Sequence, residues 1–213
     1  MTRSALALFA AFSLSACHQI DGGPEVSETR TLDAFTRVRV EGGLPVTFSP
    51  GASQVVINAP EKVVANLVTD VQSGVLIIKL KPNVIVSSLD STEISVSGTG
   101  LVAAETSGGS NLTVSGVDAS PFRATASGGS GLIVKGTTAD ARLNASGGST
   151  LTAKELVAET ASVEATGGST IELNATRSVE GIASGGSHVI VGGTATDVYV
   201  STSGGSRVTN AQQ

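Results

Sequence analysis

Residues 122–153 read FRATASGGSGLIVKGTTADARLNASGGSTLTA, and this stretch decides the fold. It holds two copies of Ser-Gly-Gly-Ser, at 127–130 and 146–149, with alternating apolar residues around them. Apolar side chains two positions apart face the same side of a β-strand, so we expect a short strand on either side of each Gly-Gly pair. The pair itself fits a tight corner, because glycine adopts positive φ and lets neighbouring backbones approach closely.

The motif repeats at a nearly constant interval. Copies begin at residues 107, 127, 146, 166, 184 and 203, with Thr in place of the first Ser at 166, and successive copies lie 18 to 20 residues apart. A flexible Gly/Ser linker lacks such a period, whereas stacked repeats that bury their apolar faces against one another require it. The predicted fold is all-β, a β-helix-like β-solenoid of roughly 19–20-residue rungs about 4.8 Å apart. The predicted corner glycines are Gly108, Gly109, Gly128, Gly129, Gly147, Gly148, Gly167, Gly168, Gly185, Gly186, Gly204 and Gly205.

Aliphatic residues recur at a fixed distance from the corners, and stacking would join them into one column. Aromatic residues make up only 3% of the chain, so this column must replace an aromatic core. We expect the serines that flank each Gly-Gly pair to satisfy corner amides and to form ladders from rung to rung. The residues of the column are Leu112, Leu132, Leu151, Ile171, Val189 and Val208.

The motif is absent from residues 32–96. Alternating apolar residues separated by Gly and Pro predict further strands there, and a short helix is expected over 61–67 after Pro60. We expect 32–96 to be an irregular β segment that caps the solenoid of 97–210, with 32–210 forming one continuous domain. Ser97-Gly98-Thr99-Gly100 lies half a period before Ser107, and we interpret it as the opposite corner of the first rung.

The first seventeen residues are typical of an export signal. An apolar run over 5–12 follows Arg3, and it is shorter than the roughly 20 residues of a membrane-spanning helix. Leu14-Ser15-Ala16-Cys17 resembles the bacterial lipobox, in which cleavage precedes a cysteine that becomes diacylated; the alternative is a stray thiol in an ordinary signal peptide. We expect a signal peptide over 1–16, lipidation of Cys17 and a flexible tether over 17–31.

The predicted location is the cell envelope. His18 follows the cysteine, and in lipoproteins of this kind a residue other than Asp permits delivery to the outer membrane of a Gram-negative bacterium. The sequence leaves open which face of that membrane displays the protein. We therefore expect the protein to be attached to the membrane through its N-terminal lipid.

Composition and spacing argue against several other classes of function. The net charge is −5 and there is no basic run, which argues against nucleic-acid binding. A nucleophilic serine needs a base beside it, but strand alternation points the neighbours Ser187 and His188 to opposite faces. We expect no catalytic residues and no cofactor.

The acidic residues are scattered along the repeats. Asp140 and Asp197 share one repeat position but lie three periods apart, so a metal or lyase site would need Asp118 or Glu159, which are out of line with them. Calcium requires a cluster of oxygen ligands, and no metal site is predicted.

The order of these features resembles the putative auto-transporter adhesin head GIN domain family. The resemblance rests on Val38-Arg39-Val40-Glu41-Gly42, on Val46-Thr47-Phe48, on Leu76-Ile77-Ile78 and on the corners that follow about twenty residues apart. It covers roughly residues 32–210. It implies a β-helix-type fold in an exported, often lipid-modified protein, and it carries over no catalytic residues.

Three functions remain open at this point. The first is a non-enzymatic surface module, adhesin-like, whose Ser-, Thr- and Asn-rich face contacts an envelope polysaccharide or protein. The second is a degenerate carbohydrate-active β-helix enzyme, which rests on analogy of fold alone. The third is a structural scaffold or assembly piece that pairs through the end of the solenoid. Ligand, partner and oligomeric state are left open.

Overall fold

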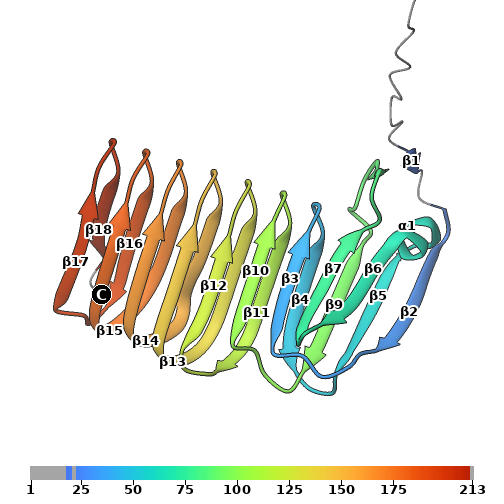
Figure 1. Cartoon of the computed structure of the whole chain (residues 1–213), viewed down its shortest axis with the longest axis horizontal. Helices are drawn as coiled ribbons and strands as arrows, with labels where there is room; N and C mark the ends of the chain where they lie inside the picture. Colours follow the sequence, from blue (N-terminus) through green and yellow to red (C-terminus); the bar gives the residue numbers. More distant parts are fainter. Residues whose placement is uncertain (1–17, 21–22, 212–213) are drawn as a thin grey trace, which may run out of the picture.

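The computed structural model describes residues 18–20 and 23–211, and strand makes up 67% of it. It confirms the β-solenoid, drawn out into a flat rod of two layers (Figure 1). The elements in chain order are β1 (His18–Ile20), β2 (Glu25–Thr31), β3 (Arg37–Glu41), β4 (Pro45–Pro50), β5 (Gln54–Pro60), α1 (Glu61–Asn66), β6 (Leu67–Gln72), β7 (Val75–Leu80), β8 (Val84–Val86), β9 (Glu93–Gly98), β10 (Ala103–Ser107), β11 (Asn111–Asp118), β12 (Phe122–Ala126), β13 (Gly131–Ala145), β14 (Thr150–Ala165), β15 (Thr170–Ala183), β16 (His188–Gly193), β17 (Asp197–Thr202) and β18 (Arg207–Ala211).

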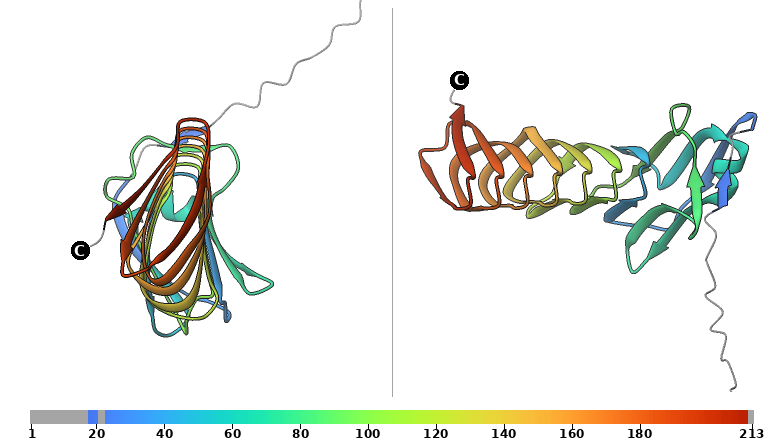
Figure 2. Two further views of the ribbon diagram at one scale, coloured as in Figure 1. Left: turned by 90° about the vertical axis from the view of Figure 1, so that its left-hand side faces the viewer. Right: turned by 90° about the horizontal axis from the view of Figure 1, so that it is seen from above.

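Each rung consists of two strand segments joined by a Gly-Gly corner. Layer A is made of the segments that lead into the corners, namely β3, β10, β12, the second halves of β13 to β15, and β17. Layer B is made of the segments that leave the corners, namely β4, β11, the first halves of β13 to β15, β16 and β18. All these pairings are parallel, and the view along the rod shows a narrow section with the corners superposed (Figure 2).

The core is the predicted aliphatic column. Leu112, Leu132, Leu151, Ile171 and Val189 are paired in register through layer B and are buried. Layer A places Ala104, Ala124, Leu143 and Val163 in register as well. Because the alternate residues of each strand point outward, every rung adds one thin slice of core and one row of surface side chains.

The two glycines of a corner have different roles. The first has φ between +60° and +68° and the second between +74° and +79°, so both adopt a conformation that favours glycine. A Cβ on Gly147 would lie 3.3 Å from the backbone nitrogen of Gly128 in the preceding rung, whereas one on Gly148 would meet nothing within 4 Å. The first glycine is therefore required by the stack and by φ, the second by φ alone. The amide of Gly148 donates to the carbonyl of Gly167 in the next rung at 2.9 Å.

The second serine of each motif forms the expected ladder. Ser149 is buried; its hydroxyl lies 2.8 Å from the carbonyl oxygens of both Ala126 and Ser146, and it accepts a hydrogen bond from the Ser146 amide at 3.1 Å. The first serine of the motif, here Ser146, is only half-buried and contributes its backbone. The equivalent buried serines are Ser110, Ser130, Ser169 and Ser187.

The N-terminal segment supplies a rung in addition to a cap. Gly42-Gly43 forms a further corner between β3 and β4, which pair with β10 and β11. Leu44 is buried where later rungs carry serine, and the amide of Gly43 donates to the hydroxyl of Ser110 at 3.0 Å. The chain then leaves the stack and returns as β7 and β9, which pair in parallel with β3 and β4. β9 ends at Gly98, and Gly100 lies in the turn that leads from β9 to β10, at the opposite corner predicted for this motif.

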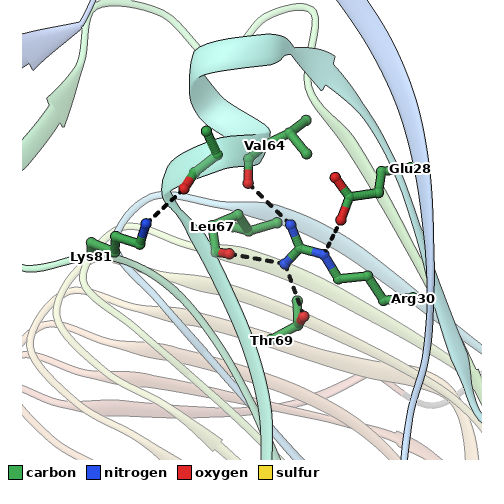
Figure 3. A network of polar contacts seen from close by, with 7 residues as sticks. Glu28, Arg30, Val64, Leu67, Thr69 and Lys81 are labelled. Carbon is green, nitrogen blue, oxygen red and sulfur yellow. Dashed lines mark hydrogen bonds and ion pairs between the residues drawn. The ribbon is translucent and has the colours of Figure 1, made fainter.

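Antiparallel strands and one helix close this end of the rod. β5 pairs with β9, β6 with β7, and β2 with β5, all antiparallel, while α1 lies within the predicted helical range and buries Val63 and Val64. Arg30 of β2 binds this cap (Figure 3): it donates to the carbonyls of Val64 (3.1 Å) and Leu67 (2.9 Å) and to the hydroxyl of Thr69 (3.0 Å). Among the described residues β2 and β6 are the outermost strands at this end, each paired on one side only, and they join the sheet antiparallel to their neighbours instead of continuing the parallel stack of rungs.

The expected flexible tether over 17–31 is wrong for most of its length. Residues 18–20 form β1, paired with β8, and residues 25–31 form β2 along the edge of β5. The sequence showed few apolar residues here, but β2 is held by its backbone ladder and by Arg30 rather than by burial. Cys17 lies outside the described residues.

The other end of the rod is open. β17 and β18 each pair on one side only among the described residues, and Val198, Val200 and Val208 are only half-buried. Tyr199 is 76% exposed on the last strand of layer A.

Candidate binding surface

Arginines of successive rungs form a column on the outer face of layer A. The strand register aligns Arg37 of β3, Ala103 of β10, Arg123 of β12 and Arg142 of β13. Strands lie about 4.8 Å apart, so the backbones of Arg37 and Arg123 are roughly 9.6 Å apart with Ala103 between them.

The small side chain of Ala103 leaves a depression in this column. Ala103 is 6% exposed although it faces away from the core, because its larger neighbours rise on both sides of it. We call this depression the arginine notch; its volume is about 510 Å³. It is lined by Arg37, Val102, Ala103, Glu105, Ser120, Pro121, Arg123 and Arg142.

The arginines of the notch differ in how they are compensated. The nearby Arg39 pairs with Glu105 at 2.8 Å, and this hydrogen bond, followed by the charge of Glu105, raises the pKa of Arg39 above its usual value. Arg142 lies 3.4 Å from Asp140, and Arg37 donates to the carbonyl of Ser73 at 2.9 Å.

Arg123 is the exception. Its side chain has no hydrogen-bond or ion-pair partner among residues 18–20 and 23–211, and it is exposed. The notch therefore carries one guanidinium whose donors are available to a bound anion.

A second depression, of about 610 Å³, lies toward the open end on layer B. Leu173, Ile190 and the glycines 192 and 193 line it, and Lys154, its one charged lining residue, pairs with Glu172 at 3.0 Å. It is larger than the arginine notch, but its polar groups do not converge on one point.

The acidic residues considered from the sequence are only partly brought together. Asp118 and Glu159 line one shallow depression of about 350 Å³, where Glu159 lies 3.5 Å from Arg177. Asp140 faces Arg142, and Asp197 lies at the start of β17. Within the described part of the chain, no three His, Cys, Asp or Glu residues are placed to hold a metal ion.

Ser187 and His188 make separate contacts. Ser187 is buried and donates toward the carbonyls of Ala165 and Ser184, while the His188 ring contacts the Thr209 hydroxyl at 3.0 Å. Ser187 is thus a rung of the serine ladder.

The predicted site residues were the twelve corner glycines and Cys17. The glycines all lie in corners with positive φ, where they shape the scaffold. Sequence reasoning missed the arginine notch, although Arg123 and Arg142 stand at the same position relative to the next Gly-Gly pair. Arg37 stands at the same position before Gly42-Gly43, but Glu41 and Leu44 flank that pair where most later corners carry Ser, so the sequence pattern did not mark it as a copy of the repeat.

Comparison with known proteins places this rod among related folds. A putative adhesin from Bacteroides fragilis is similar with a TM-score of 0.72 at 15% identity, over 91% of this chain and 99% of that one. A putative lipid binding protein from Parabacteroides distasonis (TM-score 0.59, 16% identity, 92% and 100%) and a putative adhesin from Parabacteroides merdae (0.52, 14%, 92% and 99%) share the fold. No curated protein sequence gives a significant match.

The described residues contain no helix long and apolar enough to cross a membrane. The family is shown by the sequence itself, through a match that takes in β3, the cap and most of the stacked rungs. Residues 34–195, well over half of the chain, match the family described as putative auto-transporter adhesin, head GIN domain, and the protein belongs to that family.

Proposed function

We propose that this protein is a non-catalytic envelope lipoprotein that acts as an adhesin-like binding module. Membership of an adhesin family supports a role at the cell surface or envelope. The observation that carries the proposal is the arginine notch, an accessible depression with an uncompensated guanidinium on a rigid stack of rungs. Sites on regular strands hold their side chains more precisely than sites on loops.

The position of the N-terminus fits a lipid anchor. β1 and β2 belong to the capped end of the rod, so a lipid on Cys17 would hold that end at the membrane. Layer A and the open end would then stand clear of the bilayer. Two or three acyl chains make such an anchor durable.

Binding is tested with the soluble chain from residue 18 onward, its fold verified by circular dichroism, on a glycan array and in pull-downs from envelope extracts. Reproducible capture of a glycan or an envelope protein is expected. Clean negative results in both assays would contradict the adhesive function.

Anchoring is tested separately in cells. Cys17→Ser should abolish labelling by fatty-acid analogues and leave an unprocessed precursor, whereas Ser13→Ala, outside the lipobox, should be labelled normally. Normal labelling of Cys17→Ser would refute the lipid anchor.

The open end favours a second candidate function, self-association. β17 and β18 present unpaired edges beside the half-buried Val200 and Val208, and such edges accept further strands. The capped end finishes in the antiparallel strands β2 and β6 and does not repeat the geometry of the rungs, so we expect two copies to meet through their open ends as a closed pair. Sedimentation over a concentration series should show dimers that Val200→Lys abolishes; a monomer at every concentration would contradict this role.

The geometry gives no comparable support to carbohydrate cleavage. Glycosidases generally use two carboxyl groups at the scissile bond. Glu105 is the one carboxylate among the lining residues of the arginine notch, and Arg39 already holds it at 2.8 Å. Asp118 and Glu159 do line one depression together, but it is shallow and Glu159 lies 3.5 Å from Arg177.

A further inference from the structure

We infer that the arginine notch binds the carboxylate or sulfate groups of an acidic polysaccharide, with Ala103 as its floor and Arg37 and Arg123 as its walls. This inference rests on the proposed adhesive function and names the class of its ligand.

The spacing of the notch suits one planar or tetrahedral anion. Arg37 and Arg123 stand two strands apart, about 9.6 Å at the backbone, and the intervening Ala103 leaves the space between them open. Arg123 offers its whole guanidinium fork to an anion on the floor, and this fork matches the oxygens of a carboxylate or sulfate. Arg37 can add the donors that its hydrogen bond to the Ser73 carbonyl leaves free.

The charges around the notch leave room for a bound anion. Four arginines, at positions 37, 39, 123 and 142, face the carboxylates of Glu41, Glu105 and Asp140. Glu105 is taken up by Arg39 and Asp140 lies beside Arg142, whereas Arg123 has no side-chain partner within the described residues. An anion in the notch would therefore balance the positive charge of Arg123, although the chain as a whole has a net charge of −5.

The floor and rim of the notch fit a sugar ring. Pro121 and the 43%-exposed Val102 lie beside the arginines and give an apolar surface for the C–H face of a sugar. Binding sites of this kind combine apolar walls with a few converging polar groups.

The rest of layer A argues for a polymer rather than an anionic membrane. Beyond Arg142 the same column continues with Ser162 and Glu180, and Glu164 lies in the neighbouring column. A flat anionic bilayer laid on this face would meet these carboxylates, whereas a linear polysaccharide can contact the arginines and then leave the surface.

The test measures binding of the chain from residue 18 onward to polygalacturonate, to dextran sulfate, to neutral dextran, and to vesicles of equimolar phosphatidylglycerol and phosphatidylcholine. Two variants remove a wall, Arg123→Gln and Arg37→Gln, and Ala103→Leu fills the floor without changing any charge. Matched controls are Arg207→Gln, an exposed arginine of layer B, and Ser162→Leu, in the same column but outside the notch.

Acidic polymers should bind and neutral dextran should not. Each arginine variant should weaken binding about tenfold, since a hydrogen bond to a charged group has that effect. Ala103→Leu should weaken binding at least as much, because the leucine side chain fills the floor of the notch on which the sugar ring would lie. Both controls should bind like the unaltered chain, and affinity should fall as salt is raised.

Four results would overturn the inference. Equal losses for Arg123→Gln and Arg207→Gln would reduce binding to unspecific charge attraction. Undiminished binding by Ala103→Leu would remove the notch as the site, and preference for the vesicles would replace the polysaccharide by a lipid surface. A neutral glycan or a protein captured in the adhesion assays, with no acidic polymer bound, would overturn the inference and leave the proposed function standing.

Discussion

The asymmetry of the two corner glycines gives the sharpest test of the stacked architecture. Gly147→Ala and Gly148→Ala place the same methyl group on adjacent residues of one corner. Both residues have positive φ, +63° and +75°, but only the methyl group on Gly147 points at the preceding rung. We expect Gly147→Ala to be clearly the more damaging.

The magnitudes follow from the local geometry. An L-residue in the left-handed region costs roughly 1–2 kcal/mol, and alanine recovers about 0.4–1 kcal/mol by restricting the unfolded chain, so Gly148→Ala should cost about 1 kcal/mol. In Gly147→Ala the new Cβ lies 3.3 Å from the nitrogen and 3.6 Å from the Cα of Gly128. These backbone atoms are held by the rungs on both sides, so overpacking adds about 1–3 kcal/mol.

Urea unfolding followed by circular dichroism measures both variants against the unaltered chain, with the midpoint and slope compared. Gly148→Asn serves as a control, because asparagine tolerates the left-handed region and should cost less than alanine there. Equal destabilisation by Gly147→Ala and Gly148→Ala, or a larger effect at Gly148, would refute the contact between corners.

Three further predictions concern the ladder, the cap and the repeat. Ser149→Ala should lower the free energy of unfolding by about 1–3 kcal/mol, because it removes the hydrogen-bond partner of buried backbone groups. Ser146→Ala should change the free energy of unfolding much less, and equal shifts of the urea midpoint for the two variants would contradict the ladder. Arg30→Met should speed amide hydrogen exchange in Glu25–Thr31 and α1 while the amides of the rungs stay protected. Arg207→Met at the open end should leave amide exchange in the cap unchanged. Unchanged exchange in β2 of Arg30→Met would show that Arg30 does not hold this strand in place. Deletion of residues 127–145 joins Ala126 to Ser146 in register, so the shorter rod should fold with a lower urea midpoint. A chain that lacks only residues 127–136 should not fold, because about half a rung is lost. Circular dichroism that shows both products equally folded would contradict the period.

The repetitive part of the fold could be predicted because each rung repeats the same physical problem. Leu132 and Leu151 face inward because apolar residues alternate along their strands, and the Gly-Gly pairs form the turns because glycine has no side chain. The spacing of these residues was therefore enough to predict the register and the corners. The first rung could not be predicted in this way. Leu44 occupies the place of the buried serine there, and its neighbours along the rod come from a distant part of the sequence.

The edge strand β2 and the binding surface could not be predicted from the sequence pattern either. Glu25–Thr31 has the composition of a tether, and it becomes a strand because β5 offers an unpaired edge and Arg30 finds three acceptors in the cap. The arginine notch depends on Ala103 standing between two arginines, and this arrangement appears only when β3 is set beside β10.

The pairing of β3 and β4 with later strands also bears on the order in which the molecule folds. Arg39 and Glu105 are 66 residues apart, whereas the contacts of later rungs join residues about one repeat apart. Closing the longer loop carries the larger entropic cost, so the stack should nucleate among β12 to β16 and grow in both directions from there. A chain that emerges from its N-terminus must therefore hold β3 and β4 without their later neighbours until β10 and β11 arrive. In that interval β7 and β9, which pair in parallel with β3 and β4, can already cover one edge of each strand.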